Sequence, residues 1–343
     1  MNTSDLAPLP RAHGPVLGSA RLRTVPEDFW VDEILGFSPS GQGEHLFVRI
    51  RKRERTTDQV AGFLARAVGV ARGAVSYAGM KDKRAVTQQW FSVHLPGRMI
   101  DLPLGEFGPG IEVLEVRRHD KKLRRGVLRG NRFRLRLREV DAPAAAVSAR
   151  LGQIARYGVP NYFGEQRFGR DGGNVEQARA MLAGRLRPRD RSLRGILLSA
   201  ARSHLFNQVL AERLRQGNWA SAIAGDLLML DGRNSLFPVE SIDDVIRRRV
   251  LALEIHPTGP LSGRGGPATS AAAAALEQQI LASDPELVEG LAAAGLEGAR
   301  RALRLRIAEL GWWFPAPGEV ELSFALTAGA YATCVVRELF EER

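Results

Sequence analysis

The first third of the chain switches between strand-like and helix-like spacing of its hydrophobic residues. Strand-like runs on both sides of the turn-rich segment GFSPSGQGE predict a hairpin over residues 20–50. Through residues 57–70 apolar positions recur at i, i+3 and i+4, which predicts an amphipathic helix capped by Thr56 or Thr57. A polar, glycine-containing loop over residues 79–84 then lies between two β-rich segments, and such loops commonly carry function.

Residues 131–138, NRFRLRLR, alternate strictly between apolar residues and arginines. A strand would place the two sets on opposite faces of a sheet. A half-buried strand with a solvated charged face is one interpretation. We favour a surface that follows RNA phosphates, because four like charges on one face repel each other and more cations precede them. Its members are Arg132, Arg134 and Arg136.

After Tyr157 the pattern becomes mostly helical, and after Leu303 it returns to β. Helices are predicted over residues 175–182, 193–214, 268–281 and around 285–303, while LRLRIAELGWWF, EVELSFAL and the final GAYATCVVREL read as β. This order predicts an α+β fold in which a mainly helical domain is inserted into a sheet-based one. At 343 residues the chain is long enough for two domains.

The charge of the chain indicates an anionic partner. Lys and Arg number 49 against 38 acidic residues, which gives a net charge of +11 and a pI near 10.6. Residues 117–138 contain nine Arg and two Lys against Asp120 alone, so the excess marks a site. No apolar run approaches the ~18 residues of a membrane span and no signal peptide is visible, so we expect a cytoplasmic protein. One cysteine and scattered histidines predict neither a disulfide nor a bound metal.

Several common chemistries lack their motifs here. The chain has no Gly-Lys dipeptide for a P-loop, no G-x-S-x-G and no H-E-x-x-H, and GRGGPA at residues 263–268 follows no strand. What remains is Asp82 in YAGMKDKRAVTQQ, flanked by cations that keep it ionised. A turn aspartate is the plain interpretation of the loop alone. Together with the arginine strand and the aromatic segment VPNYFGEQRFGRDGGN, the loop indicates an RNA-binding protein.

Five segments of the chain, in their order and spacing, closely resemble the tRNA pseudouridine synthase D family. They are YAGMKDKRAVTQQ, LRGNRFRLRLR, VPNYFGEQRFG, SHLFNQVLAERL and GAYATCVVREL, and VPEDFWVDE also fits. The resemblance spans residues 22–339. It implies a sheet-based pseudouridine synthase catalytic domain over residues 1–157 and 304–343, interrupted by an insertion domain over residues 158–303.

The resemblance also assigns roles to single residues. It implies that Asp82 is the catalytic aspartate and that Phe29, Asn131 and Tyr331 line the target uridine. An aromatic face suits stacking on a flipped base, and the Asn131 amide can both donate to and accept from a base edge; ordinary core packing is the alternative for the two aromatic residues. Because such aspartates are generally paired with a cation, Arg337 and then Lys81 are the candidate partners of Asp82, with a surface helix arginine as the alternative for Arg337.

The resemblance implies the isomerisation of uridine-13 of tRNA to pseudouridine. That reaction exchanges an N1–C1′ bond for a C5–C1′ bond and transfers nothing to or from a cofactor, so we expect none. Asp82 would act as a nucleophile or as a base that takes a sugar proton, and the sequence leaves both open. The alternatives are a non-catalytic RNA-binding protein of the same fold and an RNA methyltransferase, which would need a glycine-rich cofactor loop. We expect a monomer with tRNA as its partner and no obligate protein partner.

Overall fold

The protein is described by a computed structural model that covers residues 9–343. These residues form two compact units, each built from segments far apart in the sequence. Unit 1 contains residues 9–15, 150–306 and 331–339, and unit 2 contains residues 16–149, 307–330 and 340–343. The predicted catalytic and insertion domains are functional assignments, and their boundaries after residues 157 and 303 stay a prediction.

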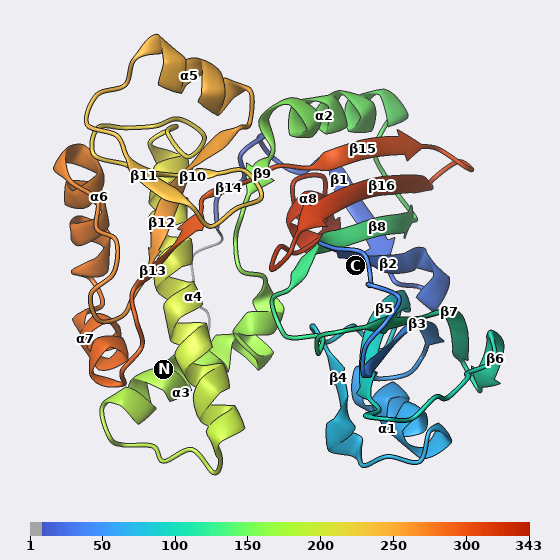
Figure 1. Cartoon of the computed structure of the whole chain (residues 1–343). Helices are drawn as coiled ribbons and strands as arrows, with labels where there is room; N and C mark the ends of the chain where they lie inside the picture. The colour runs from blue at the N-terminus through green and yellow to red at the C-terminus, as the bar shows by residue number, and fades with distance from the viewer. Residues whose placement is uncertain (1–8) are drawn as a thin grey trace. The chain divides into compact units, whose positions relative to one another are not determined.

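Unit 2 is built on a mixed sheet with the helix α1 (Thr57–Ala67) against one face (Figure 1). The main order is β15-β16-β8-β2-β5-β3-β7-β6, with β1 beside β8 and β17, and β4 beside β5. The strands are β1 (Gly18–Leu22), β2 (Phe29–Leu35), β3 (His45–Arg53), β4 (Val75–Tyr77), β5 (Val86–His94), β6 (Gly105–Gly108), β7 (Ile111–His119), β8 (Leu128–Arg138), β15 (Ala308–Trp313), β16 (Val320–Thr327) and β17 (Phe340–Glu342).

The predicted hairpin over residues 20–50 is wrong, because β5 lies between β2 and β3. β5 pairs in parallel with β2 and antiparallel with β3. Its side chains are buried on both faces of the sheet, which favours a central position over an edge. The predicted helix is confirmed as α1: Thr56 caps it and forms a capping box with Gln59. The predicted loop over residues 79–84 is also confirmed, between β4 and β5.

The register of the strands sorts the residues of unit 2 onto two faces of the sheet. Phe29, Val31 and Glu33 of β2 alternate with Trp30 and Asp32, and their partners in β8 alternate in the same way. The face that carries Phe29, Val31 and Glu33 is called the α1 face, because Ile50 and Val48 of β3 pack against α1 on that side. The opposite face is called the arginine face, since Arg132, Arg134, Arg136 and Arg138 of β8 lie on it.

Unit 1 combines helices with a four-stranded sheet of order β11-β10-β12-β13, so it is less purely helical than predicted. The helix predicted around residues 285–303 ends at Ala293, because residues 299–302 pair with β12. The final segment GAYATCVVREL, predicted as β, contains a short helix instead. The helices are α3 (Gly173–Leu182), α4 (Arg191–Arg215), α5 (Asp244–Leu251), α6 (Ala271–Leu281), α7 (Pro285–Ala293) and α8 (Thr333–Arg337). The strands are β9 (Val159–Pro160), β10 (Leu227–Leu230), β11 (Leu236–Pro238), β12 (Ile255–Leu261), β13 (Ala299–Ala302) and β14 (Arg304–Leu305); α2 (Ala144–Tyr157) contributes to both units.

Candidate active site

Asp82 lies in the loop between β4 and β5, on the α1 face of unit 2. Buried side chains hold the backbone of this loop. Gln89 Nε2 donates to the Gly79 carbonyl at 2.5 Å, Thr57 Oγ1 accepts from Lys81 N at 3.0 Å, and Lys52 Nζ donates to the Asp82 carbonyl at 2.7 Å. The side chain of Asp82 itself is 49% exposed. A fixed backbone therefore presents a carboxylate that solvent, and a substrate, can reach.

Arg23, just after β1, is the cation that pairs with Asp82, with Nη2 3.2 Å from Oδ2. Its guanidinium also lies over the Phe29 ring, 4.1 Å from the centroid. Arg23 has a left-handed backbone (φ 62°), and its buried Nε has no partner among the described residues. Backbone strain and an unsatisfied donor at one residue are typical of functional sites, where the surroundings enforce the conformation. Sequence reasoning missed Arg23, since nothing in RLRTVPEDF marks which arginine reaches Asp82.

The proposed pairing of Lys81 with Asp82 is corrected by the structure. Lys81 Nζ lies 2.5 Å from Glu33 Oε1, and the side chains of the two residues are 9% and 0% exposed. Glu33 Oε2 also accepts from Trp90 N at 2.8 Å. Burial raises the pKa of the Glu33 carboxyl, and the Lys81 ammonium opposes that rise. Lys81 points into the protein because Glu33 is the buried acceptor within its reach.

Asn131 stands beside this ion pair, because it is the register partner of Glu33 in the β2–β8 ladder. Directly opposed residues of an antiparallel pair project on the same face. The buried Oδ1 atom of Asn131 has no hydrogen-bond partner among the residues that the structure describes. An unsatisfied buried acceptor is costly, so its presence favours a partner that arrives from outside.

Phe29 is on the same face, but its ring is covered in this structure. It is 3% exposed, packs edge-to-face against Phe133 and lies under Arg23. The phenyl ring thus anchors the Arg23 guanidinium through a cation–π contact. Stacking of a base on Phe29 stays a prediction, and it requires Arg23 to move off the ring.

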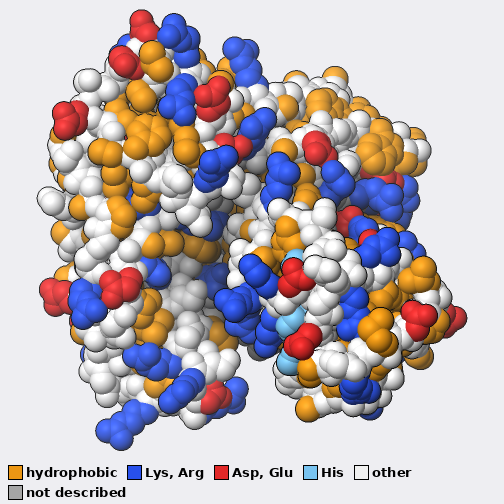
Figure 2. Space-filling model, in the orientation of Figure 1, with side chains coloured by type: hydrophobic (Ala, Val, Ile, Leu, Met, Phe, Trp, Pro, Cys, Tyr) orange, Lys and Arg blue, Asp and Glu red, His pale blue; other side chains and the backbone are white. Residues whose placement is uncertain are grey.

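Arg132, Arg134, Arg136 and Arg138 lie on the opposite face from Asn131, and three of them are paired with carboxylates. Arg132 Nη2 lies 2.9 Å from Glu309 and Arg136 Nε lies 2.7 Å from Glu321. Arg138 pairs with Asp28 and Glu319. Arg134 instead stacks over the Trp30 ring at 4.7 Å. Figure 2 shows basic and acidic side chains intermixed on the visible surface of the region where Figure 1 draws β8 and β16. The neighbouring strands thus relieve the repulsion on which the phosphate-surface interpretation depended, and contact of Arg132, Arg134 and Arg136 with RNA stays a prediction.

Tyr331 and Arg337 belong to unit 1. The Tyr331 hydroxyl accepts from Arg167 Nη2 at 2.6 Å, and its ring meets Phe163 edge-on. Arg337 donates to the carbonyls of Leu9 and Pro10 and stacks over a tyrosine ring. A role of Tyr331 at the uridine, and one of Arg337 as the partner of Asp82, stay predictions.

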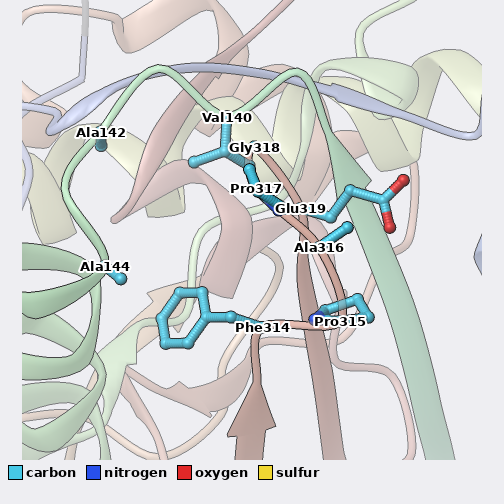
Figure 3. Close-up of a pocket in the computed structure, with 9 residues that line it drawn as sticks. All are labelled: Val140, Ala142, Ala144, Phe314, Pro315, Ala316, Pro317, Gly318 and Glu319. Atoms are coloured by element: carbon cyan, nitrogen blue, oxygen red, sulfur yellow. The ribbon is translucent and has the colours of Figure 1, made fainter.

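A pocket of about 360 Å³ in unit 2 contains none of these residues. Figure 3 shows its lining, in which the Phe314 ring extends toward Ala144 while the Glu319 carboxylate points away. Within residues 9–343, no group of three His, Cys, Asp or Glu side chains is arranged to hold a metal ion. The same residues include no helix that is both long and apolar enough to cross a membrane.

Comparison with known proteins gives both the class, a tRNA-modifying enzyme, and the family. The model of the family tRNA pseudouridine synthase D (TruD) matches residues 16–187 and 172–339. The chain is 50% identical over 333 residues to tRNA pseudouridine synthase D of Methylococcus capsulatus, and 47% identical over 332 residues to that of Azotobacter vinelandii. Both alignments cover 97% of this chain and 94% of the relative. The chain belongs to the tRNA pseudouridine synthase D family.

A solved structure supports the fold independently. A protein from Methanosarcina mazei, described as a tRNA pseudouridine synthase D, superposes with a TM-score of 0.71 at 23% identity, covering 95% of this chain and 94% of that one. The predicted α+β fold, the family and the enzyme class, a pseudouridine-forming isomerase, are confirmed.

Proposed function

We propose that the protein converts uridine-13 of tRNA to pseudouridine, with Asp82 as the catalytic carboxylate and without a cofactor. The observation that carries this proposal is the half-exposed Asp82 carboxylate on a backbone fixed by buried side chains and paired with Arg23. The relatives are named tRNA pseudouridine synthase D, which supports tRNA as the substrate class.

The reaction consists of four changes at the uridine. The N1–C1′ bond of the uridine breaks, the uracil turns, C5 joins C1′, and the proton of C5 is replaced by one on N1. Asp82 attacks C1′ as a nucleophile or removes a sugar proton as a base, and in both roles the Arg23 guanidinium, 3.2 Å from Oδ2, would hold the carboxylate in position. The unpaired Oδ1 of Asn131 suits the imide N–H of the uracil, so the base is held while it is detached.

The test is Asp82→Asn, assayed by mapping pseudouridine at single-nucleotide resolution in tRNA treated with the purified protein. We expect kcat to fall by about 10³-fold or more, because an amide is neither a base nor a nucleophile at neutral pH. Asp101→Asn, at an exposed aspartate of the same unit, is the matched control and keeps wild-type activity. Asp82→Asn activity within about tenfold of wild type would exclude the catalytic role. A folded wild-type protein that binds tRNA but forms no pseudouridine would favour the non-catalytic alternative.

The absence of a cofactor is tested separately. Dialysed protein should keep its full rate in EDTA on a minimal RNA whose fold needs no magnesium, because isomerisation transfers nothing to or from a cofactor. A rate that is lost in EDTA and returns only when metal is added to the protein would contradict this mechanism. We propose further that the protein is a monomer and acts in the cytoplasm. Light scattering after gel filtration tests the oligomeric state, and imaging of a tagged chain tests the location.

A further inference from the structure

Lys52 of β3 is an ammonium buried on the α1 face directly beneath the Asp82 loop. The residue is 0% exposed. Its Nζ donates to the Asp82 carbonyl at 2.7 Å and reaches the Lys81 carbonyl at 3.5 Å, the limit of hydrogen-bond distance. Lys52 thus donates to the backbone of Asp82, the residue proposed to carry the chemistry. No carboxylate in the described part of the chain forms an ion pair with the Lys52 ammonium.

Holding this loop in place does not by itself require a charge. Thr57 and Gln89 fix two other backbone groups of the same loop and are neutral. A buried ammonium is expensive unless it is paired, because it loses its hydration. Burial lowers the pKa of Lys52 to about 8, with Asp82 and Glu33 opposing that change and Lys81 adding to it. Because burying this cation is unfavourable, its presence indicates a role that the neutral side chains of Thr57 and Gln89 do not fill.

The composition of the chain supports this point independently. The sequence contains 44 arginines and only five lysines, and three of the lysines, Lys52, Lys81 and Lys83, lie in the loop or beneath it. A lysine ammonium is compact and can approach one carbonyl closely, whereas a guanidinium is a wide planar fork that cannot lose its proton in this range. At position 52, beneath the loop, the chain thus has the compact cation in place of its usual arginine.

We propose that Lys52 is a positioning residue for Asp82: its buried ammonium draws the carbonyls of residues 81 and 82 inward and so turns the Asp82 side chain outward toward Arg23. The inference rests on the proposed catalytic role of Asp82. Charge-assisted hydrogen bonds are roughly twice as strong as neutral ones, so the ammonium fixes the loop more firmly than an amide would. Its positive charge also lies on the inner side of the Asp82 peptide, opposite to the side on which Arg23 pairs with the carboxylate.

The kinetic test is Lys52→Met, with Ile50→Val as the matched control. Ile50 is equally buried and lies two residues away on the same face of β3, and its side chain has no polar atom with which to hold the loop. We expect Lys52→Met to lower kcat by about 10²-fold, the effect of misplacing a reacting group by about 1 Å, while KM for tRNA stays within about threefold of wild type. Ile50→Val should leave both constants near wild type. Equal losses in the two variants, or a folded Lys52→Met protein with wild-type kcat, would overturn the proposal.

The pH profile distinguishes positioning from mere filling of space. In the wild type kcat should be maximal below the Lys52 pKa and should fall as pH rises through about 8, where the ammonium is lost. The groups facing this ammonium are Asp82, Lys81 and Glu33, and Arg23 lies beyond Asp82. Lys52→Met should lack this alkaline fall, and Ile50→Val should keep it. The same alkaline fall in Lys52→Met would refute the assignment.

A spectroscopic measurement keeps the inference testable even if Lys52→Met does not fold. With only five lysines, protein labelled with ¹³C-lysine should give a resolved set of Cε signals, of which one titrates near pH 8. In Asp82→Asn that pKa should drop by about one pH unit, because the opposing carboxylate is gone; an unchanged value would sink the proposal. Asp82→Asn also separates the catalytic role of Asp82 from the positioning role of Lys52. If Asp82→Asn is active, the proposed function is excluded. If Asp82→Asn is inactive but Lys52→Met is fully active, only the role of Lys52 is excluded.

Discussion

Removing the cation of the buried Lys81–Glu33 pair should destabilise unit 2 far more than removing a surface cation. In Lys81→Met the Glu33 carboxylate loses the ammonium 2.5 Å away and keeps only the Trp90 N–H at 2.8 Å. Breaking one side of a buried ion pair typically costs about 3–5 kcal/mol, because a charge is left without compensation. The exposed Arg21–Glu139 pair, with both side chains 52% exposed, is the matched control; Arg21→Met should cost at most about 1 kcal/mol.

The pH dependence of that loss has a definite sign. Burial raises the pKa of Glu33 in the folded protein, and Lys81 is the largest influence that opposes the rise. A raised carboxyl pKa contributes stability that is complete below the unfolded value of 4.5 and is lost as pH rises through the folded pKa. Without Lys81 the folded pKa rises further, so the difference between Lys81→Met and wild type should shrink as pH is lowered from about 8 toward 5.

Urea unfolding followed by tryptophan fluorescence measures these differences, and a double-mutant cycle with Glu33→Gln isolates the pair. We expect a coupling free energy of about 2 kcal/mol or more between the two substitutions, within the range found for groups in contact. Additivity of the two single losses within about 0.5 kcal/mol would show that the ion pair contributes nothing of its own. A Lys81→Met loss no larger than that of Arg21→Met would refute the reasoning as well.

Three further outcomes follow from single contacts. Gly130→Ala should lower the free energy of unfolding by about 3 kcal/mol, and with it Tm, because a Cβ there would overlap the Leu326 carbonyl of the adjacent strand. A parallel loss of activity would reflect displacement of Asn131. The Cys334 thiol, whose pKa burial raises to about 11, should stay unlabelled by iodoacetamide at pH 8 until the protein is denatured. Arg134→Gln should reduce the salt dependence of tRNA affinity more than Arg136→Gln, as titrations at several salt concentrations would show, because Glu321 already pairs with Arg136.

The sequence predicted local structure well and long-range pairing poorly. The helix begun at Thr56 and the alternating strand β8 depend on neighbours within a few positions, and both are present. The hairpin failed because the partner of β2 on that side is β5, some fifty residues away, and no local signal encodes that register. The apolar run around Val335 is too short for its period to distinguish strand from helix, and it forms α8.

The candidate site divides in the same way. Asp82 was found from its loop motif, whereas Arg23 and Lys52 reach it only through the fold, from β-rich segments in which arginine and lysine are common. The carboxylates that pair with the arginine face did leave a signal. Glu319 and Glu321 alternate with apolar residues in EVELSFAL as the arginines do in β8, and two such strands side by side place opposite charges together.

The pairing of β17 with β1 joins two segments that are about 320 residues apart in the sequence, and this has a consequence for folding. β17 pairs in parallel with β1, Gly18 opposite Phe340, and the Arg343 N–H donates to the Ala20 carbonyl. A contact across so long a loop costs more closure entropy than a local one, so we expect it to form late and to leave this edge of β1 unpaired in partly folded states. Unpaired edges are prone to aggregation. Removal of residues 340–343 should then yield less soluble protein, although it removes no residue of the candidate site.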